Sequence, residues 1–291
     1  MAMALEFEKL EGAGNDFIFI EDRADRIDLQ PQQVRFLCDR HFGIGADGVI
    51  VVKPSGLEGC DGFMHYINSD GTLAQMCGNG VRCFAKYLVD HGFAPAEGPL
   101  SVETRAGVKS ISYTVDGLGK LVTATVDMGA PVLEPRAVPV QLAPNAEFGG
   151  QPFASDVPIP SPFGDFSFTC ISMGNPHAVT FVEDCGAMDI DAVGAYYESC
   201  EAFPEKANIE FATIGPEGIA MRVYERGCGE TLACGTGACA TEVAAFLTGR
   251  SGPENDVLLR GGTLHIAYEP GGSVLMTGPA AFVYSGSITL P

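Results

Sequence analysis

Basic residues are scarce in this chain of 291 residues. It has 17 lysines and arginines against 37 aspartates and glutamates, so its formal net charge is 17 − 37 = −20 at pH 7. A surface this acidic repels phosphate backbones. We therefore do not expect the chain to bind DNA or RNA.

Long hydrophobic runs are also missing. No stretch approaches the roughly 18 uninterrupted apolar residues of a spanning helix. Residues 1–8 lack the basic region and the long apolar run of a signal peptide. We expect a cytoplasmic protein without a membrane partner.

The ten cysteines contain no Cys-x-x-Cys pair, and they are too sparse for a small disulfide scaffold. No zinc ribbon or thioredoxin-like site is therefore expected, and no ligand cluster predicts a metal. Most of the thiols are expected to be small buried apolar groups, Cys83 and Cys239 among them.

What the chain has in excess is glycine. Its 37 glycines are about 13 % of the residues, against a usual share of about 7 %. Such a content favours tight turns, or backbone brought close to something small. The length suggests about two domains, and 46 % hydrophobic with 19 % charged residues is a globular composition.

Short β-rich runs separated by turn residues recur along the chain. We expect strands at 17–21, 48–52, 63–67, 100–104, 110–115, 121–126, 166–172, 178–182, 220–224, 257–259, 263–267, 273–276 and 281–284. Helical patterns are fewer, at 32–39, 79–90 and 236–247. The predicted fold class is α/β of the α+β type, dominated by strands.

Eight of the 19 prolines lie between residues 129 and 164. Proline removes ladder donors and blocks helices, so this segment is either a linker or an irregular edge. A domain boundary near residue 127 is expected.

The two halves of the chain resemble each other. Gly14-Asn15 and Gly174-Asn175 are 175 − 15 = 160 residues apart, and the Cys-Gly-x-Gly elements at Cys77 and Cys234 are 234 − 77 = 157 apart. Two landmarks with nearly equal offsets predict a duplicated domain. The alternative is coincidence, because such pairs are common in a glycine-rich chain.

Each Cys-Gly-x-Gly element places a cysteine where a helix begins. The first N–H groups of a helix have no internal partner, and the helix dipole adds partial positive charge there. That end binds anions, and it can lower a thiol pKa from about 8.5 to between roughly 3.5 and 7.5. We expect the thiolate to be stabilised.

Two such copies, related by a pseudo-two-fold axis, would place two cysteines on one cleft. An α-carboxylate held by both sets of N–H groups would leave its α-carbon between the sulfurs. One thiolate can remove the α-proton while the other sulfur, as a thiol, protonates the opposite face. This predicts a two-base racemase or epimerase that needs no Schiff-base cofactor.

The remaining polar candidates are mostly amides beside turns or strand ends: Asn15, Asn68, Asn79, Asn175 and Asn208. An isolated asparagine in a turn usually serves local backbone chemistry, whereas several in one cleft would suit a zwitterion. Glu225 could hold an ammonium and Arg226 a carboxylate, although such pairs are more often surface pairs. His177 could orient the site in a supporting role.

At these residues the chain resembles diaminopimelate epimerases. The matching segments occur in family order over almost the whole chain: Gly12-Ala13-Gly14-Asn15-Asp16-Phe17, Gly43-Ile44-Gly45-Ala46-Asp47-Gly48, Asn68-Ser69-Asp70-Gly71, Met76-Cys77-Gly78-Asn79-Gly80-Val81-Arg82-Cys83, Ser172-Met173-Gly174-Asn175-Pro176-His177, Tyr224-Glu225-Arg226-Gly227 and Gly229-Glu230-Thr231-Leu232-Ala233-Cys234-Gly235-Thr236-Gly237.

The resemblance implies interconversion of L,L- and meso-diaminopimelate for lysine and cell-wall precursor synthesis, without pyridoxal phosphate or another cofactor. It implies Cys77 and Cys234 as the acid/base pair. Residues implied to contact substrate are Asn15, Asn68, Asn175, Asn208, Glu225 and Arg226, with backbone N–H groups of Gly78, Asn79, Gly235 and Thr236 on the reacting carboxylate. The expected partners are this small amino acid and, in a homodimer, a second copy.

The resemblance also implies two pseudo-symmetric, strand-rich, barrel-like domains, each around a central helix, with the active-site cleft between them. The first would comprise residues 1–126 plus 278–291 and carry Cys77, and the second residues 127–277 with Cys234. Three positions depart from the family pattern, namely Glu11 in place of a usual histidine, Cys228 and Ile209.

Other readings remain open. A proline racemase or hydroxyproline epimerase would share the fold and the cysteine pair, but those enzymes typically carry histidine where this chain has Asn79. A non-catalytic, thiol-based anion-binding or redox module is an alternative from another class. A metal-binding protein has no ligand cluster to support it.

Overall fold

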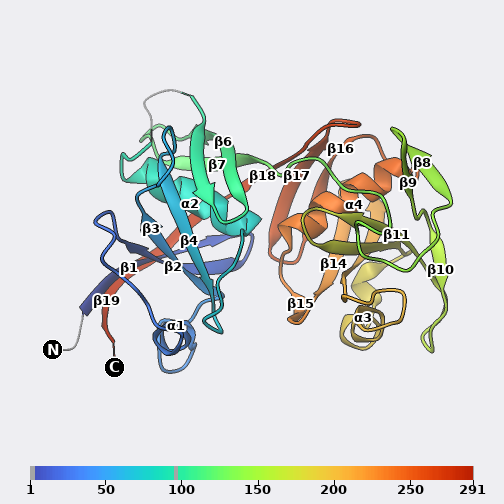
Figure 1. Cartoon of the computed structure of the whole chain (residues 1–291), viewed down its shortest axis with the longest axis horizontal. Coiled ribbons are helices and arrows are strands. Elements are labelled where there is room, and N and C mark those ends of the chain that lie inside the picture. The colour runs from blue at the N-terminus through green and yellow to red at the C-terminus, as the bar shows by residue number, and fades with distance from the viewer. Residues whose placement is uncertain (1–3, 95–97, 291) are drawn as a thin grey trace. The chain divides into compact units, whose positions relative to one another are not determined.

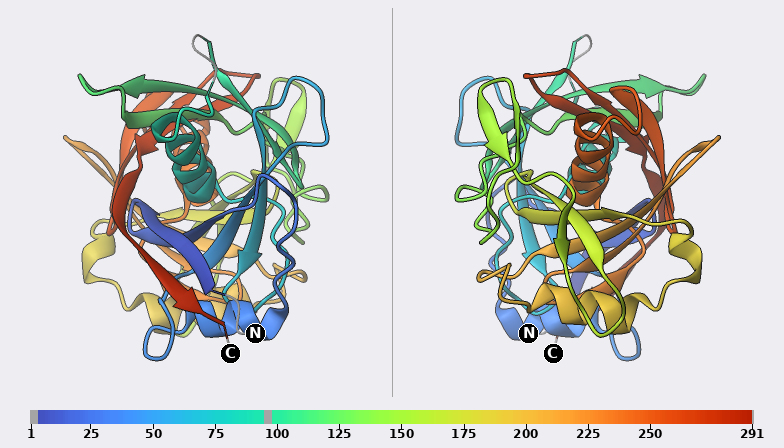
Figure 2. Two further views of the ribbon diagram at one scale, coloured as in Figure 1. Left: turned by 90° about the vertical axis from the view of Figure 1, so that its left-hand side faces the viewer. Right: turned by 90° about the vertical axis from the view of Figure 1, so that its right-hand side faces the viewer.

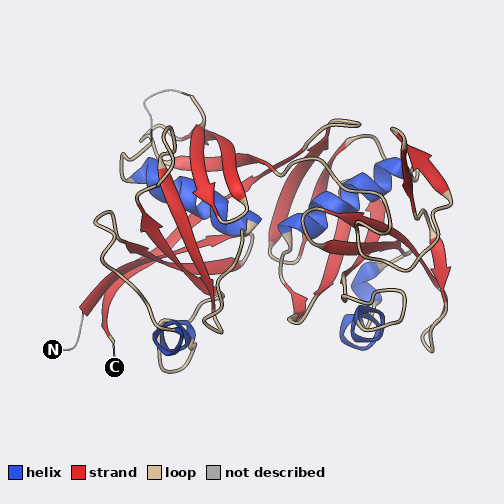
Figure 3. Cartoon of the chain, viewed as in Figure 1, coloured by secondary structure: helices blue, strands red, loops and turns tan. Residues whose placement is uncertain are grey.

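The computed structural model describes residues 4–94 and 98–290. The chain divides into two compact units, residues 1–126 with 277–291 and residues 127–276. Both are built mainly from strands with few helices, so the mixed α+β class is confirmed (Figure 3). In the described residues no helix is long and apolar enough to cross a bilayer.

The first unit combines the start of the chain with its end (Figure 1). Its elements are β1 (Ala4–Gly12), β2 (Asn15–Glu21), α1 (Pro31–Cys38), β3 (Gly48–Lys53), β4 (Gly62–Asn68), α2 (Gly78–Asp90), β5 (Leu100–Thr104), β6 (Gly107–Val115), β7 (Leu121–Asp127) and β19 (Ala281–Thr289). Strand β2 pairs antiparallel with β1 and parallel with β3, and β1 also pairs antiparallel with β19.

The second unit is continuous in sequence. Its elements are β8 (Ala146–Phe148), β9 (Gln151–Phe153), β10 (Val157–Ile159), β11 (Phe166–Ser172), β12 (Pro176–Phe181), η1 (Cys185–Ala187), α3 (Ile190–Glu198), β13 (Asn208–Gly215), β14 (Gly218–Glu225), β15 (Gly229–Thr231), α4 (Gly235–Leu247), β16 (Glu254–Leu259) and β17 (Gly262–Tyr268). Strand β18 (Val274–Pro279) runs across the boundary between the units.

The order of elements and strand pairings repeats. In the first unit β2 and β3 are parallel, with α1 between them in the chain, and β3 and β4 are antiparallel. In the second unit β12, α3, β13 and β14 follow the same pattern. Strands β3 and β13 begin at Gly48 and Asn208, which are 208 − 48 = 160 residues apart. The topology therefore supports the predicted duplication.

One long helix lies inside the strands of each unit, α2 in the first and α4 in the second (Figure 2). Most residues of both helices are buried, including the charged residues Lys86 of α2 and Glu242 of α4. Arg82 is fully buried in α2. Its guanidinium donates to the Gly78 carbonyl at 3.2 Å and to Asn79 Oδ1 at 3.1 Å. These bonds make the buried charge tolerable and tie the start of α2 together.

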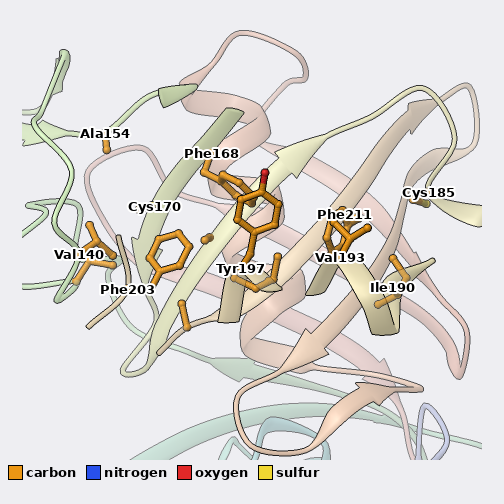
Figure 4. Close-up of a cluster of buried hydrophobic side chains, with 14 residues drawn as sticks. Val140, Ala154, Phe168, Cys170, Cys185, Ile190, Val193, Tyr197, Phe203 and Phe211 are labelled. Atoms are coloured by element: carbon orange, nitrogen blue, oxygen red, sulfur yellow. The ribbon is translucent and has the colours of Figure 1, made fainter. Parts of the chain in front are cut away.

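Helix α3 and strands β1 and β13 are absent from the predicted elements. The α3 sequence contains glycine and aromatic residues, which are weak helix formers, and packing stabilises it instead. Its Val193 and Tyr197 lie in a buried cluster with Phe168 and Phe203 (Figure 4). Tertiary contacts here outweigh local propensity.

The proline-rich segment 129–164 is part of the second unit. It contains a two-stranded pair, β8 with β9, and strand β10, which pairs with β11. The irregular-edge interpretation is therefore right, and the linker interpretation is wrong.

Candidate active site

Two cysteines occupy the same position in the two units, the cap of the buried helix. Cys77 precedes α2, and its Sγ accepts from the Gly80 N–H at 3.5 Å. Cys234 precedes α4, and its Sγ accepts from the Gly237 N–H at 3.4 Å. Both sulfurs thus take the place of the usual side-chain oxygen of a helix cap.

The next N–H groups of each helix start have no acceptor within their own helix. They belong to Gly78 and Asn79 in the first unit and to Gly235 and Thr236 in the second. Together with the helix dipole they form a site suited to a carboxylate beside each sulfur.

Asn15, at the start of β2, is the side chain that links Cys77 to its surroundings. The Cys77 thiol donates to Asn15 Oδ1 at 3.5 Å, and Asn79 Nδ2 donates to the same oxygen at 3.4 Å. Three of the predicted site residues therefore meet at the start of α2.

Asp47 is a site neighbour that the sequence analysis did not single out. Its Oδ2 accepts from Asn15 Nδ2 at 2.5 Å, which turns the amide oxygen of Asn15 toward Cys77. Arg40 bridges Asp47 and Asp16 at 2.9 and 2.8 Å. Asp47 belongs to the segment ending at Gly48 that resembles the family, and this resemblance could have identified it as a site residue.

Asn68 ends β4 on the same edge of the sheet. It is in register with Gly48, the residue that follows Asp47. Its Nδ2 donates to Thr72 Oγ1 at 3.0 Å, so a local turn holds the side chain.

Cys234 has an acidic environment. It is buried, and Thr236 Oγ1 lies 3.4 Å from its Sγ. Burial, followed by the negative charges of Glu225 and Glu210, raises the pKa of the Cys234 thiol well above its ordinary value. The expected lowering of the thiol pKa at this helix start is therefore wrong for Cys234, because desolvation and two carboxylates outweigh the helix end.

Glu225 is the last residue of β14, and Arg226 follows it. Glu225 Oε1 accepts from Thr231 Oγ1 at 2.5 Å, and a hydrogen bond with Cys234 also lowers its pKa, although burial prevails and raises it. The backbone of Arg226 donates to Asn208 Oδ1 at 2.9 Å, and the Arg226 side chain is exposed. Glu225 is thus a direct neighbour of the thiol.

His177 and Asn175 flank the same helix start from β12. His177 is fully buried, with Nδ1 at 2.6 Å from Glu210 Oε1 and Nε2 at 3.0 Å from Asn175 Oδ1. Glu210 was missed, because a carboxylate inside a strand without a visible partner gives no signal in the sequence.

The residues that depart from the family pattern have local roles. Glu11 Oε2 accepts from the Gly14 N–H at 2.9 Å and closes the turn before Asn15. Ile209 is a buried core residue and Cys228 is exposed. Cys83 and Cys239 are fully buried, as expected of packing residues.

A metal centre finds no support in the described residues. Within residues 4–94 and 98–290, no three histidine, cysteine or acidic side chains gather closely enough to hold an ion.

Comparison with known proteins decides the family. The family model described as diaminopimelate epimerase matches residues 7–134 and 169–283. The chain belongs to the diaminopimelate epimerase family. Its relatives in this family include the diaminopimelate epimerase of Leptospira biflexa, 43 % identical over 289 residues, with 99 % of this chain and all of that protein covered. The diaminopimelate epimerase of Desulfovibrio desulfuricans is 44 % identical over 98 % of this chain and 99 % of that protein.

Solved structures of other isomerases share the fold of this diaminopimelate epimerase family member. A probable proline racemase from Agrobacterium radiobacter superposes with a TM-score of 0.71 at 14 % identity, covering 99 % of this chain and 93 % of that one. A hydroxyproline epimerase from Agrobacterium vitis gives 0.70 at 14 % identity, with the same coverage. At this identity the likeness concerns the fold alone.

Proposed function

We propose that the chain interconverts L,L- and meso-diaminopimelate by a cofactor-independent, two-base mechanism in which Cys77 and Cys234 act on one α-carbon. The observation that carries this proposal is the equivalent capping position of the two cysteines in a chain of the diaminopimelate epimerase family. Family membership supplies the reaction, an isomerisation in amino-acid biosynthesis that leads to lysine.

In the proposed reaction one sulfur, as thiolate, removes the α-proton and becomes a thiol. The electron pair left on carbon delocalises into the carboxylate, which N–H groups of Gly78, Asn79, Gly235 and Thr236 would hold. The other thiol then gives its proton to the opposite face of the carbon and becomes a thiolate. Since the reaction is reversible, each sulfur acts as the base toward one stereoisomer and as the acid toward the other.

The remaining contacts suit a zwitterion with a distal amino-acid group. Glu225 would hold an ammonium and Arg226 a carboxylate. Amide groups would supply the further hydrogen bonds, from Asn15, Asn68, Asn175 and Asn208. We also propose a cytoplasmic location, which suits a mechanism that depends on reduced thiols, and a homodimeric assembly.

The test is solvent deuterium exchange into the α-position. The purified chain in D₂O is expected to exchange the α-proton of L,L-diaminopimelate and to leave proline unlabelled. The measurement is NMR or mass spectrometry of the recovered amino acids. Exchange into proline alone would instead support the proline racemase alternative, and a chain inert toward both would favour a thiol-based binding module.

A further inference from the structure

The side chains that pack near the two capping cysteines differ between the two units. In the parallel pair β2 and β3, Phe17 is in register with Gly48 and Phe19 with Ile50. In β12 and β13, His177 is in register with Asn208 and Val179 with Glu210. Offsets of 177 − 17 = 160 and 210 − 50 = 160 make His177 the counterpart of Phe17 and Glu210 the counterpart of Ile50.

Both pairs face the third residue of their helix. A side chain added at Gly80 would lie 3.2 Å from Ile50 Cδ1 and 3.4 Å from Phe17 Cζ. One added at Gly237 would lie 2.8 Å from Glu210 Oε1 and 3.3 Å from Cys234 Sγ. The first unit thus has an apolar pair under its helix start, and the second has an acid and a histidine.

A buried acid and histidine cost free energy that a phenylalanine and an isoleucine would not. Both side chains are 0 % exposed, and Glu210 Oε2 has no hydrogen-bond partner within the described part of the chain. The duplicated fold itself accommodates apolar residues at these two positions, as the first unit demonstrates. The pair in the second unit therefore points to a role other than stability.

The hydrogen bonds define how many protons the pair holds. Asn175 Oδ1 can only accept, so His177 Nε2, 3.0 Å away, must carry a proton. A second proton must lie between His177 Nδ1 and Glu210 Oε1, which are 2.6 Å apart, on either atom. The pair with both protons is electrically neutral overall, which suits its complete burial.

We propose that Glu210, through His177, is a positioning residue that fixes the amide orientation of Asn175. With His177 Nε2–H bound to Asn175 Oδ1, the Asn175 Nδ2 group faces away from the ring as a hydrogen-bond donor. The counterpart Asn15 is oriented oppositely, because Asp47 accepts from its Nδ2 and leaves its oxygen toward Cys77. The two asparagines then present an acceptor in one unit and a donor in the other.

This inference rests on the proposed function in one respect, namely that the Asn175 Nδ2 group donates to the substrate. A half-buried amide with free rotation could offer either atom to a substrate. With the orientation fixed, Asn175 favours a carboxylate oxygen and disfavours an ammonium.

The deciding variant is Glu210→Gln. Its amide can accept from His177 Nδ1–H or donate to Nδ1, so it no longer fixes the proton on Nε2 and lets Asn175 turn its Nδ2 toward the ring. The readout is the ¹⁵N NMR spectrum of protein labelled in its histidines, with His177 assigned by its loss in His177→Phe. We expect a fully protonated Nε2 in the wild type and a population with unprotonated Nε2 in Glu210→Gln.

The matched control is Glu242→Gln, which replaces another fully buried glutamate in the same unit, bound to Asn255 at 3.0 Å. We expect its His177 spectrum to be that of the wild type and its kcat/KM for α-proton exchange to stay within twofold. In Glu210→Gln, kcat/KM should fall at least tenfold, with thermal unfolding like that of the wild type.

An unprotonated Nε2 in the wild type, or an Nε2 in Glu210→Gln that is as fully protonated as in the wild type, would overturn the proposal. So would a kcat/KM of Glu210→Gln within twofold of the control. If Glu210→Gln does not fold, the double variant His177→Phe/Glu210→Ile, which copies the apolar pair of the first unit, replaces it, with the same expected loss. The wild-type spectrum needs no substrate, so it tests the pair even if the chain proves inactive on diaminopimelate.

Discussion

At the scale of single residues, Cys77 and Cys234 share a helix position and differ in their neighbours. Asn15 contacts the first, whereas Glu225 and Glu210 surround the second with negative charge. The same local motif therefore places the two thiols in different electrostatic surroundings.

Substitution of either cysteine by alanine should abolish epimerisation, because one face of the α-carbon then lacks its proton carrier. We expect activity to fall by at least about 10³-fold, within the usual range for loss of a general acid or base and its partner. Serine in place of cysteine should retain traces, because an alkoxide forms far less readily at neutral pH. The assay is NMR of the diaminopimelate stereoisomers, with Cys60→Ala, a half-buried thiol outside the site, as the control. Wild-type rates in Cys77→Ala or Cys234→Ala would refute the two-base proposal.

Glu242 gives a pH prediction that is independent of catalysis. Burial raises the pKa of this carboxyl from its ordinary value of about 4.5 to about 7. A carboxyl with a raised pKa in the folded state binds more protons when folded, so the folded chain loses stability as pH rises from about 4.5 to about 7. Glu242→Gln should remove this loss. The free energy of unfolding of the variant, compared with that of the wild type, should therefore be higher by up to about 3 kcal/mol above pH 7 than at pH 4.5. Urea unfolding at the two pH values measures it, and an equal pH dependence in both proteins would contradict it.

At the scale of elements, the third residue of each buried helix is a glycine, and the two glycines have different neighbours. Gly80→Ala meets only carbon atoms, at 3.2 Å or more, whereas Gly237→Ala would place its Cβ 2.8 Å from a buried carboxylate oxygen. We expect Gly237→Ala to destabilise the chain by about 1–3 kcal/mol and to lower the exchange rate at least tenfold. Gly80→Ala should change stability by less than about 1 kcal/mol, because gained helix propensity offsets the tight contact. Thermal unfolding and α-proton exchange of the two variants provide the comparison, and equal effects would refute the asymmetry.

Elements also decide how far the sequence is informative. The helix starts at Cys77 and Cys234 are predictable because glycines, a following helical pattern and the repeat agree there. Strand β13 is not, because Glu210 interrupts its apolar run and only the folded partner His177 makes a buried carboxylate tolerable. Helix α3 is missed because its stability comes from packing on Phe168 and Phe203. Yet α1 and β3 are predicted, and their counterparts in the repeat are α3 and β13. The repeat would therefore have indicated both missing elements.

At the scale of the whole molecule, the first unit depends on the end of the chain. Strand β19 pairs with β1 from Ala4 with Thr289 to Glu11 with Ala281, and the Pro279 carbonyl accepts from buried Arg82 at 3.3 Å. Deletion of residues 281–291 should therefore destabilise the first unit and spare the second. Hydrogen exchange followed by mass spectrometry should show loss of protection in β1 and β2 and retained protection in β12 and β13. The control is Phe282→Ser, which changes an exposed side chain of β19 without removing the strand.

Protection lost equally in both units would mean that they unfold as one cooperative body. The comparison is informative because residues 127–276 form the second unit without any contribution from either end of the chain.

The pairing of β1 with β19 has a consequence for the order of events on the ribosome. Strand β19, which completes the first unit, is synthesised long after β1. The continuous second unit is already synthesised by then, so the half that carries Cys234 can mature first. The half that carries Cys77 must wait, with one edge of β1 unpaired, until β19 has also been made.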